Sequence, residues 1–338
     1  MSDAETPSFG HPRLDSYFGT LESAILQAVA YADVFDYPLT LRQAHRYLAG
    51  VPASLSNVRR VLDNGLLQNH QLVYERGYLT MPGRESIVET RLQRQELSAL
   101  LWRKGVRYGL AIASLPFVRM VAVTGTLAVN NVEPGADIDY LVVTEPGRVW
   151  LTRSLVLVLV YLGRLEGVTI CPNYVISTNV LGQFDPSFFT AHELVQMVPL
   201  YGLAVYRDIL AANDWVQRFL PNAFTDRWAI PRECSLGPAR RALKRGGEMI
   251  LAGRLGDFWE QRESRFKIPR LREQAADCGT GAASFGPECC KGHLDDHGGR
   301  IREAYAQRLC QVGLKTESAA ILSRSTHMLS AAGQREGE

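Results

Sequence analysis

The 338-residue sequence lacks the short catalytic motifs that identify several common enzyme classes. It has no G-x-S-x-G turn for a serine nucleophile, no H-E-x-x-H pair for zinc, and no G-x-x-x-x-G-K-[ST] loop for phosphates. Serine-hydrolase, zinc-peptidase and P-loop chemistry therefore have no support in the sequence.

The sequence also lacks a long apolar run. Its most lipid-like segment, SLVLVLVYLG, spans only residues 154–163 between two arginines, whereas a membrane-spanning helix needs roughly 20 apolar residues. We therefore predict a buried helix there and no membrane partner. The N-terminal segment MSDAETPSFGHPRLDSYFGT has no apolar core of a secretory signal, which favours a cytoplasmic location.

Neither sign of charge is in large excess. The 37 Lys and Arg residues against 35 Asp and Glu give a formal net charge of +2, too small to imply nucleic-acid or membrane binding by itself. The six cysteines show no regular spacing, so we expect free thiols in a reducing compartment.

The first part of the chain is predicted to be helical, with one hairpin. Residues 1–20 are polar and are expected to be disordered. Over residues 21–83, three helical segments precede two short strands that meet at Gly77, and Thr40 and Gln43 form a capping box at the second helix. Three helices followed by a hairpin is the order of a winged helix-turn-helix.

Connecting helices over residues 84–116, interrupted near Gly105 and Gly109, are predicted to lead into a central domain. That domain, residues 117–222, alternates strands and helices. VRMVAVTG and DIDYLVVT are predicted strands, RVWLTRSLVLVLVYLGRLEG is a helix, and VTICPNYVIST is a strand with an irregularity at Pro172. We predict an α/β (α+β) fold with a mixed sheet.

The chain from residue 187 onward, including the last part of the central domain, is predicted to be mainly helical. Residues 187–220 are expected to be helical up to Pro221. Residues 223–322 are expected to form a helical C-terminal region in which ADCGTGAASFGPE is a loop. Residues 323–338 are expected to form a flexible tail.

One segment, VTGTLAVNNVEPGADIDYLVV, combines a glycine turn with two aspartates. Alternate residues of a strand point to the same face, so Asp137 and Asp139 present two carboxylates that repel unless a cation lies between them. Mg²⁺ prefers such oxygen ligands and often shares them with substrate phosphates. Gly125 allows close approach of the backbone, and Thr126 opens a helical turn that suits a phosphate.

On these residues the sequence resembles the DNA polymerase beta-like nucleotidyltransferase superfamily, whose members share a glycine–serine or glycine–threonine turn, a short helix and a D-x-D strand. The apolar runs VRMVAV and YLVV fit that pattern, over about residues 117–180. The stretch YADVFDYPLT is similar to prokaryotic members that place a winged helix first, which extends the resemblance to roughly residues 21–210.

The resemblance implies a Mg²⁺-dependent nucleotidyltransferase. An acceptor hydroxyl, on an unidentified substrate, would attack the α-phosphate of a nucleoside triphosphate (NTP) and release pyrophosphate. Two Mg²⁺ ions would stabilise the attacking and leaving oxygens. Asp137 and Asp139 would hold the metal, and Gly125 and Thr126 would bind the nucleotide.

The sequence departs from the superfamily in one respect. Its members usually carry a third carboxylate on a later strand, and the matching segment VTICPNYVIST contains no acid. Asn173 occupies the expected position; an amide oxygen can ligate Mg²⁺ but cannot act as a general base. Glu166 and Asp185 flank the strand as weaker candidates. The alternative function is a nucleotide-binding, catalytically impaired regulator that binds DNA or a protein partner through its winged helix.

The third predicted helix carries residue types that contact bases and phosphates, namely Asn57, Arg59 and Arg60. Winged helices also serve as protein-contact modules.

A second basic group lies over residues 240–272. We favour a solvated face there, with Glu248, Glu260 and Glu263 interleaved among the arginines, over a cradle for a phosphate-bearing acceptor.

Cysteine and histidine gather in the segment CCKGHLDDHGGR. Cys289, His293 and His297 are four residues apart, so on one helix they would share a face and bind zinc, with Cys290 as a fourth ligand. The glycines of this segment weaken the helix prediction, and exposed or hydrogen-bonded side chains are the favoured interpretation.

Overall fold

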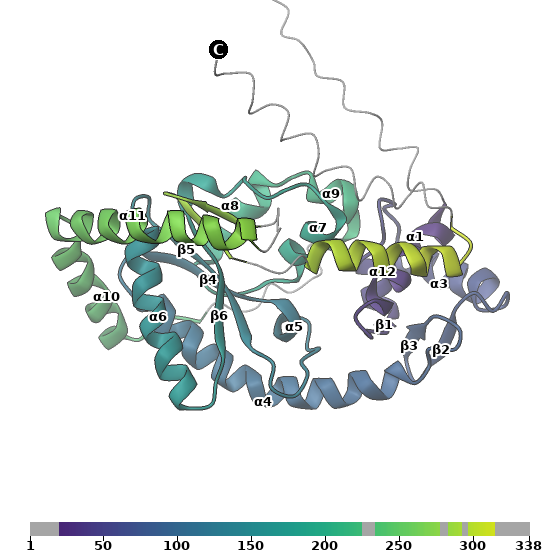
Figure 1. Cartoon of the computed structure of the whole chain (residues 1–338). Coiled ribbons are helices and arrows are strands. Elements are labelled where there is room, and N and C mark those ends of the chain that lie inside the picture. Colours follow the sequence, from purple (N-terminus) through teal and green to yellow (C-terminus); the bar gives the residue numbers. More distant parts are fainter. Residues whose placement is uncertain (1–19, 225–233, 278–282, 293–296, 315–338) are drawn as a thin grey trace, which may run out of the picture.

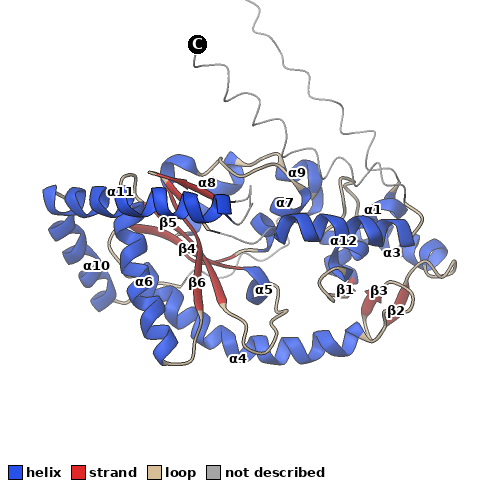
Figure 2. Cartoon of the chain, in the orientation of Figure 1, coloured by secondary structure: helices blue, strands red, loops and turns tan. Residues whose placement is uncertain are grey.

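The computed structural model describes residues 20–224, 234–277, 283–292 and 297–314. Within these ranges the chain is a mixed α/β structure with a three-stranded and a six-stranded sheet (Figures 1 and 2). Most of the predicted N-terminal disordered segment and the whole predicted C-terminal tail lie outside the described residues.

The N-terminal unit packs three helices against the small sheet, whose strand order is β1-β3-β2. The predicted helices and hairpin are present. Gln43 makes the predicted capping box with Thr40: its backbone N–H donates to Thr40 Oγ1, and its side-chain oxygen accepts from the Thr40 N–H. The elements are α1 (Leu21–Asp33), β1 (Leu39–Thr40), α2 (Leu41–Arg46), α3 (Leu55–Val61), β2 (Val73–Glu75) and β3 (Tyr78–Thr80).

Helix α4 (Ile87–Ala113) runs without a break from this unit to the large sheet (Figure 1). The predicted interruptions at Gly105 and Gly109 are therefore wrong. A Cβ at Gly109 would collide with the Leu200 side chain, and the Gly105 carbonyl accepts a hydrogen bond of 2.6 Å from the Tyr140 hydroxyl. The glycines let the helix pack closely on the sheet, which compensates for their low helix propensity.

The six strands of the large sheet follow the order β7-β4-β5-β6-β9-β8. The β5–β6 pair is parallel and the other pairs are antiparallel, so the sheet is mixed. The β5–β6 register shifts where Pro172 occurs, as predicted. The strands are β4 (Val118–Thr124), β5 (Ile138–Thr144), β6 (Ile170–Ser177), β7 (Val198–Tyr201), β8 (Ser284–Gly286) and β9 (Cys289–Lys291).

Two segments predicted to be helix or loop are strands. Within the supposed helical residues 187–220, β7 pairs with β4; its Pro199 lacks an N–H donor and is accommodated because β7 is an edge strand. Gly202, with φ of 78°, then turns the chain into the next helix. In the supposed loop ADCGTGAASFGPE, β8 forms a hairpin with β9 that extends the sheet.

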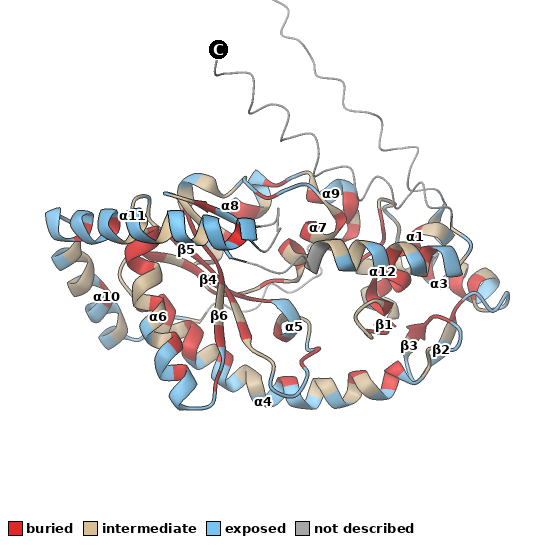
Figure 3. Ribbon diagram, viewed as in Figure 1, coloured by how far each residue is buried: buried red, intermediate tan, exposed pale blue. Residues whose placement is uncertain are grey.

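Helices cover both faces of the large sheet. Buried residues of α4 and α6 form a core with one face, and buried residues of α7, α9, α12 and the N-terminal unit form a core with the other (Figure 3). The remaining helices are α5 (Gly125–Ala128), α6 (Val149–Leu165), α7 (Phe188–Gln196), α8 (Leu203–Ala212), α9 (Val216–Phe219), α10 (Pro238–Leu251), α11 (Arg254–Asp277) and α12 (His297–Gln311).

Helix α6 contains the apolar segment predicted to be a buried helix. Val156 and Val160 are buried, but Val158, Tyr161 and Leu165 on another side are exposed, so the prediction holds for only part of its surface. None of the helices in the described ranges is long and apolar enough to cross a bilayer.

Asp33, at the end of α1, joins the two ends of the described chain. Its side chain is 1% exposed and accepts from Arg84 Nε at 3.1 Å and from Arg308 Nε of α12 at 2.5 Å. Because a buried carboxylate requires such partners, this contact helps to fix α12 against the N-terminal unit.

Candidate functional site

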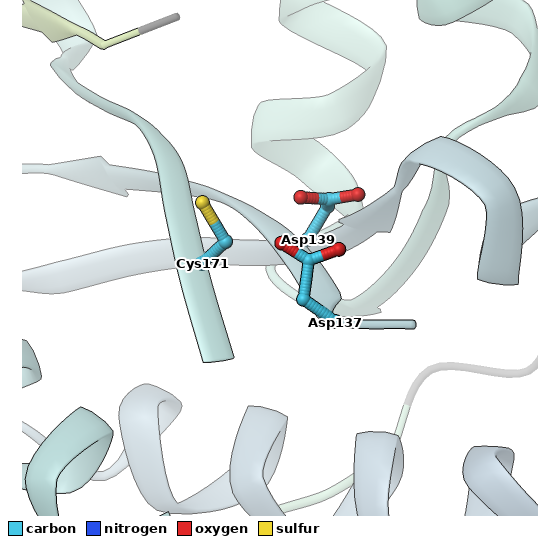
Figure 4. A group of neighbouring side chains, drawn as sticks. All are labelled: Asp137, Asp139 and Cys171. Atoms are coloured by element: carbon cyan, nitrogen blue, oxygen red, sulfur yellow. The ribbon is translucent and has the colours of Figure 1, made fainter. Parts of the chain in front are cut away.

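Asp137 immediately precedes β5 and Asp139 is its second residue, and their carboxylates point to the same side of the sheet (Figure 4). The intervening Ile138 and the following Tyr140 pack into the core that includes α4 and α6. Because side chains alternate along a strand, both carboxylates face the opposite side, toward α7 and the N-terminal unit.

Cys171 of β6 supplies a third donor beside the two carboxylates. It pairs with Asp139 in the parallel β5–β6 register, and the ligand atoms of the three residues lie within 4.8 Å of one another (Figure 4). Sequence reasoning missed Cys171, because the register of two strands separated by a helix cannot be read from local pattern.

Asn173 connects the thiol to the carboxylate. Its side chain is buried, its Nδ2 donates to Asp139 Oδ1 at 2.5 Å, and its Oδ1 accepts from the Cys171 thiol at 2.7 Å. The amide is therefore next to the aspartate pair, with its NH₂ group toward Asp139. This contact fixes the orientation of the Asp139 carboxylate.

The two flanking acids that were weaker candidates for a third carboxylate pair elsewhere. Glu166 forms an ion pair with Arg107, and Asp185 lies 3.8 Å from Lys291 Nζ. Neither belongs to the group of donors around Asp139.

Burial and, to a smaller extent, the charge of Asp137 together raise the pKa of Asp139 to about 7, although the hydrogen bond from Asn173 opposes the shift. Burial also raises the pKa of the Cys171 thiol to about 12, helped by both aspartates. At neutral pH the thiol is therefore protonated and Asp139 is partly protonated. A bound divalent cation would lower the pKa of both groups, because it stabilises their anionic forms.

Glu193 of α7 is a further acid on this side of the sheet. Burial raises its pKa to about 7, opposed by Lys291 and by a 3.4 Å hydrogen bond from the Tyr174 hydroxyl, and its charge raises the pKa of Asp139. Sequence reasoning missed it, since a single glutamate inside an amphipathic helix carries no distinguishing pattern.

Gly125 brings the backbone directly against Asp139. It begins α5 with φ of 65°, and Thr124 before it pairs with Asp139 across the β4–β5 ladder. A Cβ at Gly125 would collide with Asp139 Oδ2. The position therefore demands glycine for both its dihedral angle and its space. The neighbouring Thr126 is exposed.

The N-terminal unit holds the loop between Thr126 and Asp137. The Tyr37 hydroxyl donates to the Val129 carbonyl at 2.9 Å, and Asn131 Nδ2 donates to the Phe35 carbonyl at 2.9 Å. The stretch YADVFDYPLT therefore holds, through Phe35 and Tyr37, the loop that leads into the candidate site.

The residues proposed for DNA contact lie elsewhere. Asn57, Arg59 and Arg60 are exposed on α3, at the far end of the molecule from β5 (Figure 1). Arg59 Nε is 3.7 Å from Asp63, and Arg60 donates to Asn57 Oδ1.

The alternative of a zinc face on a single helix, which the sequence does not favour, does not fit the structure. Cys289 and Cys290 belong to strand β9, whereas His297 begins helix α12. His293 lies outside the described residues. Backbone hydrogen bonding of β9 to β6 and β8 explains the difference.

Comparison with protein-family models finds no match, and comparisons with curated proteins and with solved structures find no significant match either. Function must therefore be inferred from the residues of the site themselves.

Substitution of Gly125 by Ala is expected to disturb the carboxylates directly. We expect the free energy of unfolding to fall by about 2–4 kcal/mol, from the unfavourable φ and the collision with Asp139. Gly147→Ala is a matched control, because Gly147 has φ of 67° and open space around its Cβ position; we expect a loss of about 1 kcal/mol. Equal losses in urea unfolding would show that Gly125 does not contact Asp139.

The raised pKa of Asp139 makes stability depend on pH. The folded protein binds this proton more tightly than the unfolded chain does, so stability is lost as pH rises from about 4 to about 7. In the presence of a chelator, Asp139→Asn should therefore gain about 1–2 kcal/mol above pH 7, with no gain near pH 4. Thermal unfolding across this range tests it, with exposed Asp214→Asn as control. A gain independent of pH would contradict the assignment.

Proposed function

We propose that this protein is a Mg²⁺-dependent nucleotidyltransferase with a polymerase beta-like catalytic domain and an N-terminal winged helix. The observation that carries the proposal is the close approach of the Gly125 turn to Asp139, whose carboxylate lies beside that of Asp137. It sets exposed backbone, suited to phosphates, beside two carboxylates suited to a cation.

The donor set fits an oxygen-preferring divalent cation. Asp137 and Asp139 would hold it, and when bound it would neutralise the carboxylates and the NTP phosphates. The Cys171 thiol has a softer sulfur atom, which Mg²⁺ does not favour, and it already donates to Asn173. We therefore assign metal binding to the two aspartates; a second ion, as the resemblance implies, would be shared with the substrate phosphates.

The proposed reaction forms one bond and breaks one bond. The acceptor oxygen bonds to the α-phosphorus as the bond to the bridging oxygen breaks, and pyrophosphate leaves with that oxygen. The hydroxyl proton must also leave. Because Cys171 and Asn173 offer no base in this region of β6, we expect the proton to pass to water and turnover to rise with pH.

The same two residues favour a second candidate function, a nucleotide-binding regulator with impaired catalysis. A thiol and an amide beside Asp139 can orient a nucleotide without activating an acceptor. The exposed Asn57, Arg59 and Arg60 would then contact DNA or a protein partner through the proposed winged helix.

Label transfer distinguishes the two functions. The purified protein is incubated with fractionated cell extract and NTPs labelled at either the α- or the γ-phosphate, with and without Mg²⁺. Nucleotidyl transfer predicts Mg²⁺-dependent labelling of an acceptor from the α-position only. Asp137→Asn and Asp139→Asn should each reduce it by at least about 10²-fold, because each removes a charged ligand.

Two results would overturn the enzyme proposal. Labelling from the γ-position would identify a phosphotransferase, and labelling unchanged in both aspartate variants would place the chemistry elsewhere. Nucleotide binding without transfer, combined with salt-sensitive binding to a specific DNA duplex, would establish the regulator instead.

A further inference from the structure

Helices α10 and α11 turn polar side chains toward the body of the protein. Lys244 is buried, and its Nζ donates to the carbonyls of Ala113, Leu115 and Val118 at 3.1, 3.0 and 2.5 Å. Glu248 accepts from Arg119 Nη1 at 2.8 Å. The Lys244 contacts satisfy backbone carbonyls where α4 ends and β4 begins.

Helix α11 likewise turns acidic side chains toward the body of the protein. Glu260 is buried and accepts from the backbone N–H groups of Trp150 and Leu151, at 3.1 and 2.7 Å, in the first turn of α6. Glu263 accepts from the Ser154 hydroxyl at 2.8 Å. The expected solvated face is therefore wrong for its acids, because Glu248, Glu260 and Glu263 serve as inward-facing hydrogen-bond acceptors; the arginines among them are exposed.

The large apolar side chains of the two helices point outward instead. Phe258 and Phe266 of α11 are 59% and 64% exposed, and Leu243 and Ile250 of α10 are 70% and 68% exposed. In each helix these residues recur at intervals of seven or eight, which places them on one face. We call this surface the outer face; it comprises Leu243, Met249, Ile250, Leu255, Phe258, Trp259 and Phe266.

The outer face holds seven of the fourteen large apolar side chains that are exposed in the described ranges. A helix packed only on its own domain turns its apolar side inward. The inverted arrangement leaves a concentrated apolar surface, which marks an interaction site. Figure 3 shows both helices largely exposed, at one end of the molecule.

Arginines outnumber acids among the exposed side chains of the two helices that carry the outer face. Arg262 lies over the Trp259 ring, with its guanidinium carbon 4.9 Å from the ring centroid. The exposed arginines of the two helices are Arg241, Arg245, Arg254, Arg262, Arg265, Arg270 and Arg272, against the exposed acids Asp257, Glu273 and Asp277. The partner must therefore accept apolar side chains and carry negative charge.

We propose that the outer face binds the surface of an anionic lipid bilayer. The two helices lie in the interface, their Phe, Leu and Trp side chains enter the headgroup boundary, and the arginines contact lipid phosphates. Charge favours this occupant over a second copy of the chain, because two such faces would bring arginines together. The proposal goes beyond nucleotidyl transfer, does not depend on it, and replaces the expectation of no membrane partner.

The test is co-sedimentation of the full-length protein with lipid vesicles. We expect binding to equimolar phosphatidylglycerol and phosphatidylcholine, and at least about tenfold weaker binding to phosphatidylcholine alone. Phe258→Ser/Phe266→Ser should reduce binding to the anionic vesicles at least about tenfold, because two aromatic rings no longer enter the interface. Arg241→Gln/Arg245→Gln should reduce it about fivefold or more, and added salt should weaken wild-type binding.

Tyr161→Ser/Leu165→Ser is the matched control, because it removes two comparably exposed apolar side chains from α6. It should bind vesicles as wild type does. Circular dichroism and thermal unfolding confirm that each variant is folded. The proposal is overturned if wild type does not bind anionic vesicles, if the phenylalanine variant binds equally well, or if ultracentrifugation shows a dimer that this variant abolishes.

Discussion

The repulsion between the carboxylates of Asp137 and Asp139 is the constraint on which the candidate site depends. Two acids side by side, one of them with its pKa raised to about 7, lower the stability of the folded chain at neutral pH. Their surroundings hold them in place: Gly125 leaves room for Asp139, and Asn173 donates to it. Such an arrangement is common where function, rather than stability, determines the residues.

Local sequence pattern singles out the candidate site residues that lie on one continuous segment. Alternation along a strand and the glycine turn give Gly125, Asp137 and Asp139 without tertiary information. Cys171 and Glu193 could not be predicted, because the first depends on the β5–β6 register and the second on how α7 packs. The capping signal of the N-terminal unit was likewise local and correct.

The fold shows the same division between local and long-range information. Strands β4, β5 and β6 were predicted from apolar runs, whereas β7, β8 and β9 were missed because each has only three or four residues and depends on its neighbour. Helices α10 and α11 were predicted to be helical and basic, but not which way they face. Lys244 can be buried because the carbonyls at the end of α4 accept hydrogen bonds from it. Those carbonyls lie far from Lys244 in the sequence, so local pattern does not reveal the contact.

We propose that Asp137 and Asp139 bind a divalent cation and that a bound nucleotide completes its coordination. Mn²⁺ titration followed by electron paramagnetic resonance, with and without a non-hydrolysable NTP analogue, tests it most directly. We predict wild-type binding that tightens when the analogue is present, and at least about tenfold weaker binding in Asp137→Asn and Asp139→Asn. Equal Mn²⁺ binding by wild type and both variants, or binding indifferent to the analogue, would contradict the claim.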